Sequence, residues 1–140
     1  MTRLFTTLPL LIALMAAIGC SSKGAFDTVP VQGTVTFDGK PVTEGTLDFV
    51  PVSGSDQAMV GKPAAAKINP DGTYAAGTYG TSDGVVPGKK RVRYSAPLPE
   101  DTRENANKAP SPFTGLQIEP SEIEVTDGNE SYDFTLTKKK

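Results

Sequence analysis

The sequence contains no histidine and no tryptophan, and Cys20 is its single cysteine. Without histidine, neither a Ser–His–Asp nor a Cys–His nucleophile arrangement can form. Zinc sites built from histidine and several cysteines are excluded for the same reason, and one cysteine allows no intrachain disulfide. We therefore expect a protein that is not an enzyme, that has no metal or cofactor, and whose fold depends on its hydrophobic core.

The sequence also lacks a large excess of charge of either sign. Its 14 Lys and Arg residues against 16 Asp and Glu residues give a formal net charge of −2 at pH 7. Binding to nucleic acid depends mainly on neutralising phosphates with positive side chains. We therefore expect no nucleic-acid partner.

The longest apolar run lies at the N-terminus. Arg3 precedes it, it extends over Leu4–Ile18, and the small residue Gly19 separates it from Cys20. This layout resembles the signal peptide of a bacterial lipoprotein. The resemblance implies cleavage between Gly19 and Cys20 and attachment of a diacylglyceryl group to the Cys20 thiol. Residues 1–19 are then a signal peptide, and residues 20–28 form a lipidated tether.

Two other interpretations of this N-terminus remain open. A transmembrane helix needs about 20 apolar residues, but Leu4–Ile18 is shorter and contains Pro9. A plain secretory signal also fits the charged, apolar and small-residue layout, and Ala17 stands where the lipoprotein signal most often has leucine. The position of the cysteine directly after Gly19 favours the lipoprotein.

Lipidation at Cys20 would decide where the protein resides. Two acyl chains hold a protein durably at a membrane, at about 0.8 kcal/mol per buried CH₂ group. The resemblance implies a location in the cell envelope. In such lipoproteins an aspartate directly after the cysteine is often linked to retention in the inner membrane, and this chain has Ser21 there, which favours the outer membrane. We therefore expect a membrane as one partner, and an envelope protein or a polysaccharide as another.

Apolar and polar residues alternate with a period of two along much of the chain after Val29. Such alternation indicates half-buried strands. In the last of them, Tyr132, Phe134 and Leu136 are expected to point inward and the residues between them outward. The expected strands are Val29–Phe37, Thr46–Val50, Lys62–Ile68, Thr73–Tyr79, Lys89–Ala96, the stretch with Leu116, Ile118, Ile123 and Val125, and Ser131–Thr137.

Turn signals separate these strands at short intervals. Asp38-Gly39, Asn69–Gly72 and Asp127-Gly128-Asn129 contain residues that tolerate a positive φ, so each is expected to form a hairpin turn. Pro97–Pro112 is expected to be a long surface excursion, with one helical turn around Asp101–Asn105. The pattern predicts an all-β protein, with a single seven-stranded β-sandwich of immunoglobulin-like architecture over residues 29–137 and a basic tail at 138–140.

Several turn and core residues resemble a known family. Val31-x-Gly33-x-Val35, Asp38-Gly39-Lys40-Pro41 and Leu47-x-Phe49-x-Pro51 resemble the opening of the carboxypeptidase regulatory-like (transthyretin-like) domains found on bacterial lipoproteins. The resemblance implies a prealbumin-like sandwich, generally without known catalysis. The same order continues with Asp71-Gly72-x-Tyr74, Val86-Pro87-Gly88, Val92, Phe113–Leu116 and Phe134-x-Leu136.

The densest charge cluster is the candidate contact surface. Lys89, Arg91 and Arg93 share one face of an expected strand, where they could meet anionic headgroups or a polysaccharide. The alternative is a solvated strand face that discourages edge-to-edge aggregation.

Two further clusters have simpler explanations. Glu119, Glu122 and Glu124 could supply the carboxylate pair of a glycosidase, but nothing in the sequence predicts the cleft that such a pair needs. Asp127–Glu130 lacks the ligand spacing of a calcium loop. The competing functional hypothesis is therefore a secreted hydrolase or a small-ligand carrier, and a deep pocket lined by several ionisable groups would favour it.

Overall fold

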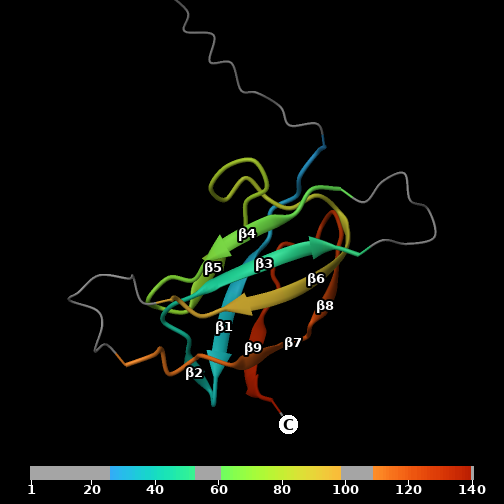
Figure 1. Ribbon diagram of the computed structural model, residues 1–140. Helices are drawn as coiled ribbons and strands as arrows, with labels where there is room; N and C mark the ends of the chain where they lie inside the picture. Colours follow the sequence, from blue (N-terminus) through green and yellow to red (C-terminus); the bar gives the residue numbers. More distant parts are fainter. Residues whose placement is uncertain (1–25, 53–60, 99–108, 140) are drawn as a thin grey trace, which may run out of the picture.

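The computed structural model describes residues 26–52, 61–98 and 109–139, and this part of the chain is all-β (Figure 1). It contains nine strands where we expected seven. The count differs because β2 has two residues, too few for a period-two pattern, and because a bend at Pro120-Ser121 separates β7 from β8. The strands are β1 (Gln32–Phe37), β2 (Lys40–Pro41), β3 (Thr46–Pro51), β4 (Ala64–Lys67), β5 (Thr73–Ala75), β6 (Gly88–Ser95), β7 (Leu116–Glu119), β8 (Glu122–Val125) and β9 (Phe134–Lys138).

The strands form two sheets in a sandwich-like arrangement. One sheet has the order β2-β1-β9-β7, with β5 also paired to β1, and the other has the order β4-β3-β6-β8. Strands β1 and β9 run parallel, whereas the other strand pairs are antiparallel. The first and last strands of the domain are therefore neighbours in the middle of one sheet.

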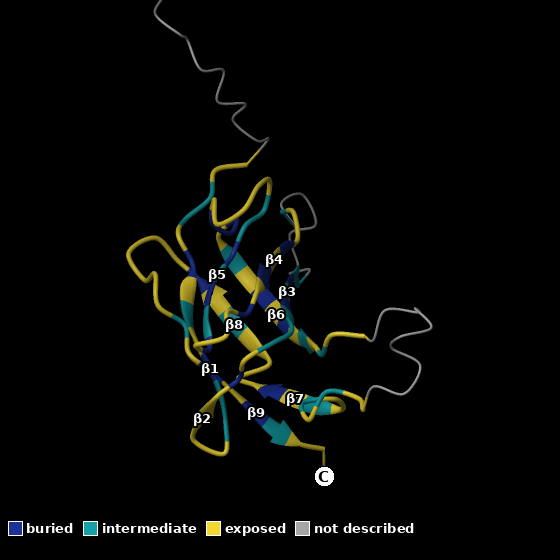
Figure 2. Ribbon diagram, turned by 90° about the vertical axis from the view of Figure 1, so that its left-hand side faces the viewer, coloured by how far each residue is buried: buried dark blue, intermediate teal, exposed yellow. Residues whose placement is uncertain are grey.

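The space between the sheets is filled by apolar side chains, and the buried residues alternate with exposed ones along the strands (Figure 2). Phe49 from one sheet meets Tyr74 and Phe134 from the other, and the centroids of the three rings lie 5.9–6.2 Å from one another. Two of the three expected inward positions of the last strand are confirmed, since Phe134 and Leu136 are buried and Thr135 is exposed, whereas Tyr132 is half-buried and precedes the strand. This interior joins residues from both ends of the domain.

Close approach of the backbone explains one glycine beside the β1–β9 pair. A Cβ atom at Gly33 would collide with the carbonyl oxygen of Tyr132. The same carbonyl oxygen accepts a hydrogen bond of 2.6 Å from the Tyr74 hydroxyl. Burial raises the pKa of Tyr74, with a smaller contribution from the nearby Asp133 carboxylate.

Two of the three expected hairpin turns do not form hairpins. The Asp38-Gly39 turn does, with φ values of 48° and 75°, and it joins β1 to its partner β2. By contrast, Asn69–Gly72 leads from β4 in one sheet to β5 in the other, and 127–129 leads from β8 to β9 in the same way. These turns reverse the chain locally, but the strands on either side pair with distant parts of the sequence.

Four strand predictions begin too early or end too late. Strand β9 begins at Phe134 and not at Ser131, which forms only an isolated bridge with Gln32. Strand β1 begins at Gln32, and Val29 forms only an isolated bridge with Val85. Strand β4 begins at Ala64, and β5 ends at Ala75. The predicted helical turn at Asp101–Asn105 and the signal peptide with Gly19 and Cys20 lie outside the described residues. Within the described residues, no helix is long and apolar enough to span a membrane.

Candidate functional site

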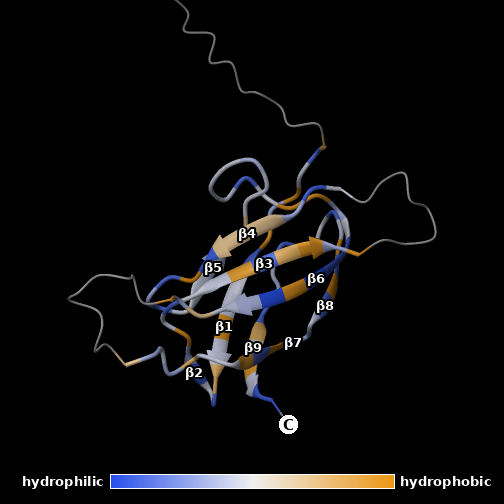
Figure 3. Ribbon diagram, viewed as in Figure 1, coloured by the Kyte–Doolittle hydropathy of each residue, from blue (hydrophilic) through white to orange (hydrophobic). Residues whose placement is uncertain are grey.

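Strand β6 has one buried face and one exposed face, and the exposed face carries the three basic residues singled out in the sequence. Lys89, Arg91 and Arg93 are all exposed, and they alternate with buried Lys90 and Val92. The alternation follows from the period of two in an extended strand. Figure 3 shows hydrophilic and hydrophobic segments alternating along β6. The three cations therefore lie on the outer face of the four-stranded sheet.

Acidic residues stand opposite each of these cations on neighbouring strands. Strand pairing places Glu124 beside Lys89 and Glu122 beside Arg91. The Nη2 atom of Arg91 lies 2.8 Å from Oε1 of Glu122, and Nε of Arg91 lies 3.2 Å from the same oxygen. The outer face is therefore a surface of mixed charge and not a uniformly basic one.

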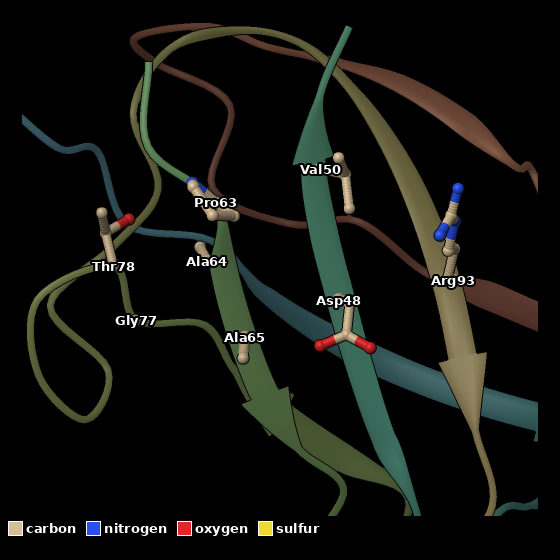
Figure 4. Close-up of a pocket in the computed structure, with 8 residues that line it drawn as sticks. All are labelled: Asp48, Val50, Pro63, Ala64, Ala65, Gly77, Thr78 and Arg93. Carbon is tan, nitrogen blue, oxygen red and sulfur yellow. The ribbon is translucent and has the colours of Figure 1, made fainter. Parts of the chain in front are cut away.

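The third cation, Arg93, borders a shallow hollow. It is paired in register with Asp48 on β3, whose other neighbour is Ala65 on β4 (Figure 4). The hollow has a volume of about 450 Å³, and several of its lining residues are small. Its lining consists of Asp48, Val50, Pro63, Ala64, Ala65, Gly77, Thr78 and Arg93.

A second hollow lies between β6 and β7, where the two sheets approach each other. It also has a volume of about 450 Å³, and Arg93 again contributes to its lining, together with Arg91 and Glu119. The carbonyl oxygen of Ser121 accepts a hydrogen bond of 2.8 Å from the Val92 amide and so closes one side of this region. Arg93 thus stands between two hollows, each lined by few ionisable groups.

One charged residue of the interior was missed in the sequence. Lys90 is 1% exposed, and burial lowers its pKa below the ordinary value of 10.5. A side chain at Gly61 would begin 3.6 Å from its Nζ atom. The period-two pattern could have found it, because Lys90 belongs to the same inward set as Val92 and Tyr94.

The remaining sequence candidates are not brought together into a site. Glu122 and Glu124 lie on β8 of the four-stranded sheet, Glu119 lies on β7 of the other, and all three are exposed. The Asp127–Glu130 segment is an exposed turn. Among the described residues, no group of three or more Cys, His, Asp or Glu side chains is placed to hold a metal ion.

The chain was compared with family models, with curated proteins and with solved structures, and none of them matches it.

Proposed function

We propose that this chain is a lipid-anchored protein of the cell envelope, and that its β-sandwich is a non-catalytic structural or interaction module. The anchor is a diacylated Cys20, and the outer membrane is the favoured location. The observation that carries the proposal is the position of this single cysteine, directly after Gly19 at the end of the apolar run and six residues before Phe26, where the described part of the chain begins. A domain so close to its anchor is a membrane-attached module.

The geometry of the domain supports the interaction role. Its interior is filled by apolar side chains, and the outer face of the four-stranded sheet presents cations and carboxylates in register. Such alternation of charge favours a specific polar partner, an envelope protein or a polysaccharide, because complementary charges select partners and orient them. We also propose that the sandwich is of the prealbumin-like type, because the turn and core residues of this chain resemble those of carboxypeptidase regulatory-like domains.

Substitution of the cysteine tests the anchor. In cells grown with a labelled fatty acid, the wild-type chain should carry label and enter the detergent phase, because two acyl chains partition into lipid. Cys20→Ser should lose the label and move to the soluble fraction. Ser21→Ala, which keeps the cysteine, is the matched control and should behave as wild type. Wild-type protein that is soluble and unlabelled contradicts the proposal.

The second candidate function, a small-ligand carrier, would use the shallow hollow that Asp48 and Arg93 help to line. Its volume of about 450 Å³ falls within the range of small-molecule sites, and a carboxylate beside a guanidinium suits a ligand with both charges. Native mass spectrometry of the protein purified from membranes distinguishes the two functions. A bound small molecule that is lost in Arg93→Ala and kept in Lys89→Ala would support the carrier.

A further inference from the structure

The chain enters the sandwich beside a small aromatic and cationic cluster. The backbone N–H of Phe26 donates a hydrogen bond of 2.9 Å to the hydroxyl oxygen of Tyr79. The Nζ atom of Lys62 lies 4.4 Å from the centre of the Tyr79 ring. We call Phe26, Lys62 and Tyr79, together with the loop Gly77–Gly84, the tether pole. Figure 1 shows the chain entering at this end of the sandwich, opposite the end that carries the C-terminus.

The loop of the tether pole is held firmly in place. The Asp83 carboxylate accepts hydrogen bonds from the backbone amides of Thr78, at 2.7 Å, and Tyr79, at 3.0 Å. The Thr28 hydroxyl donates to the carbonyl oxygen of Asp83 at 2.6 Å, which ties the loop to the entering chain. A Cβ atom at Gly84 would collide with the Val29 carbonyl oxygen, so the two segments are in close contact. Tyr79 is therefore presented from a pre-ordered loop.

The tether pole exposes apolar surface that the core does not use. Phe26 is 38% exposed and Tyr79 is 37% exposed, and they are two of the three large hydrophobic residues exposed in the described part of the chain. The third is Leu98, at 88%. Leu98 comes three residues after the end of β6. The beginning of β6 comes three residues after Val85, which forms a bridge with Val29 at the tether pole. Leu98 thus lies beyond the end of β6 that is farther along the strand from the tether pole.

The length of the tether determines what the pole faces. Six residue steps separate Cys20 from Phe26, and an extended chain spans at most about 3.3–3.6 Å per residue, or roughly 20 Å in all. A lipid on Cys20 therefore keeps this end of the sandwich within about that distance of the membrane. Because the headgroup regions add roughly 5–8 Å on each side of the hydrocarbon core, contact between the pole and the lipid surface needs no stretching of the tether.

We infer that the tether pole is a membrane-contact site, in which Phe26 and Tyr79 enter the headgroup layer and Lys62 binds a lipid phosphate. This inference rests on the lipid anchor proposed above. The Tyr79 ring, with its polar hydroxyl, is of the kind that favours the membrane–water interface, and a phenylalanine such as Phe26 can bury its ring at the boundary between headgroups and acyl chains. A lysine beside them can pair with a phosphate while its apolar stem lies along the apolar surface. The contact would fix the orientation of the sandwich and direct its far end and its sheet faces away from the bilayer.

The charges at the pole make the contact depend on the anchor. Asp27 and Asp83 are exposed at the same end as Lys62, so the pole has no net positive charge with which to attract anionic lipid. Attachment to Cys20 compensates by raising the local concentration of the pole at the membrane. Without the lipid, the same three side chains should not hold the protein on a vesicle.

Fluorescence quenching tests the contact, because the chain contains no tryptophan. Phe26→Trp introduces a single tryptophan at the tether pole, and Leu98→Trp introduces one beyond the far end of β6. The lipidated full-length variants are placed on vesicles of phosphatidylethanolamine and phosphatidylglycerol that contain a brominated phospholipid. We expect quenching at position 26 to exceed that at position 98 by at least about twofold, and Lys62→Glu to reduce the quenching at position 26 by about half. Tyr79→Trp is a second probe if Phe26→Trp folds poorly.

Flotation of the same vesicles separates the two proposals. If the protein floats with the vesicles and positions 26 and 98 are quenched equally, the membrane contact is wrong and the anchor stands. If the wild-type chain carries no fatty acid and does not float, the anchor is wrong, and the contact falls with it. A Cys20→Ser, Phe26→Trp variant that is quenched as strongly as the lipidated form would also overturn the dependence on the anchor.

Discussion

The interior between the sheets and the outer face of the four-stranded sheet are built from the same strands and follow different physical rules. On β6, Val92 and Lys90 face inward and are buried, while Arg91 and Arg93 face outward and are exposed. Inside, side chains are selected by shape and by the cost of removing charge from water. Outside, water screens the charges, so charged side chains can be placed there at little cost to stability.

The largest expected effect comes from the interior. Phe134→Ala removes a ring that packs against Phe49 and Tyr74, and we expect it to lower the free energy of unfolding by about 3–5 kcal/mol. Thr135→Ala, one residue along and exposed, should cost less than half as much. Thermal and urea unfolding of the soluble 21–140 chain measure both. Equal losses, or a larger loss at Thr135, would show that β9 is assigned to the wrong face.

An intermediate effect is expected at the buried cation. Burial lowers the pKa of Lys90 in the folded state below its ordinary value of 10.5. At a pH between the folded-state pKa and the unfolded-state pKa, the unfolded chain binds a proton that the folded chain lacks. The free energy of unfolding therefore rises with pH over that window. Below the window the charged amine is retained at a cost. Lys90→Met should therefore increase stability at pH 7 and remove the rise.

The matched control for this prediction is Lys89→Met, on the outer face of the same strand. It should leave the rise with pH in place. Burial raises the pKa of Tyr94 to about 12, which lowers stability above pH 10 or so in every variant alike. Urea unfolding as a function of pH gives the comparison, and a rise that persists in Lys90→Met would contradict the assignment.

The smallest effect is expected on the outer face. The Arg91–Glu122 ion pair has a distance of 2.8 Å, but its side chains are 50% and 52% exposed. A double-mutant cycle of Arg91→Ala and Glu122→Ala should give a coupling energy of about 0.2–1 kcal/mol, and high salt should reduce it. A coupling above about 2 kcal/mol would show that this face contributes to stability like the interior.

Local features of the fold could be predicted from the sequence where one strand face is apolar. The alternation that buries Phe49 and Phe134 is visible in the residues themselves, and so is the tight turn at Asp38-Gly39. The three exposed cations of β6 were predicted by the same pattern. Lys90 was missed because a cluster of basic residues was treated as surface, although its position in the alternation placed it inside.

Strand pairing could not be predicted in the same way. The turn signals at 69–72 and 127–129 are correct as turns, but the strands that flank them belong to different sheets. A turn depends on the conformations that three or four residues tolerate, whereas pairing depends on which distant apolar faces meet. The parallel pairing of β1 with β9 is of this kind, because it joins residues about a hundred positions apart.

The sequence by itself determined the strand periodicity, the turns and the candidate lipid anchor at Cys20, because each depends on neighbouring residues. Only the tertiary structure decided that each of the exposed cations Lys89, Arg91 and Arg93 has an acidic neighbour in register and that Lys90 is buried. It also decided that Phe26, Lys62 and Tyr79 meet at the end where the tether enters. These three residues are far apart in the sequence, so no local pattern predicts that they meet. They come together because the two sheets bury a common core.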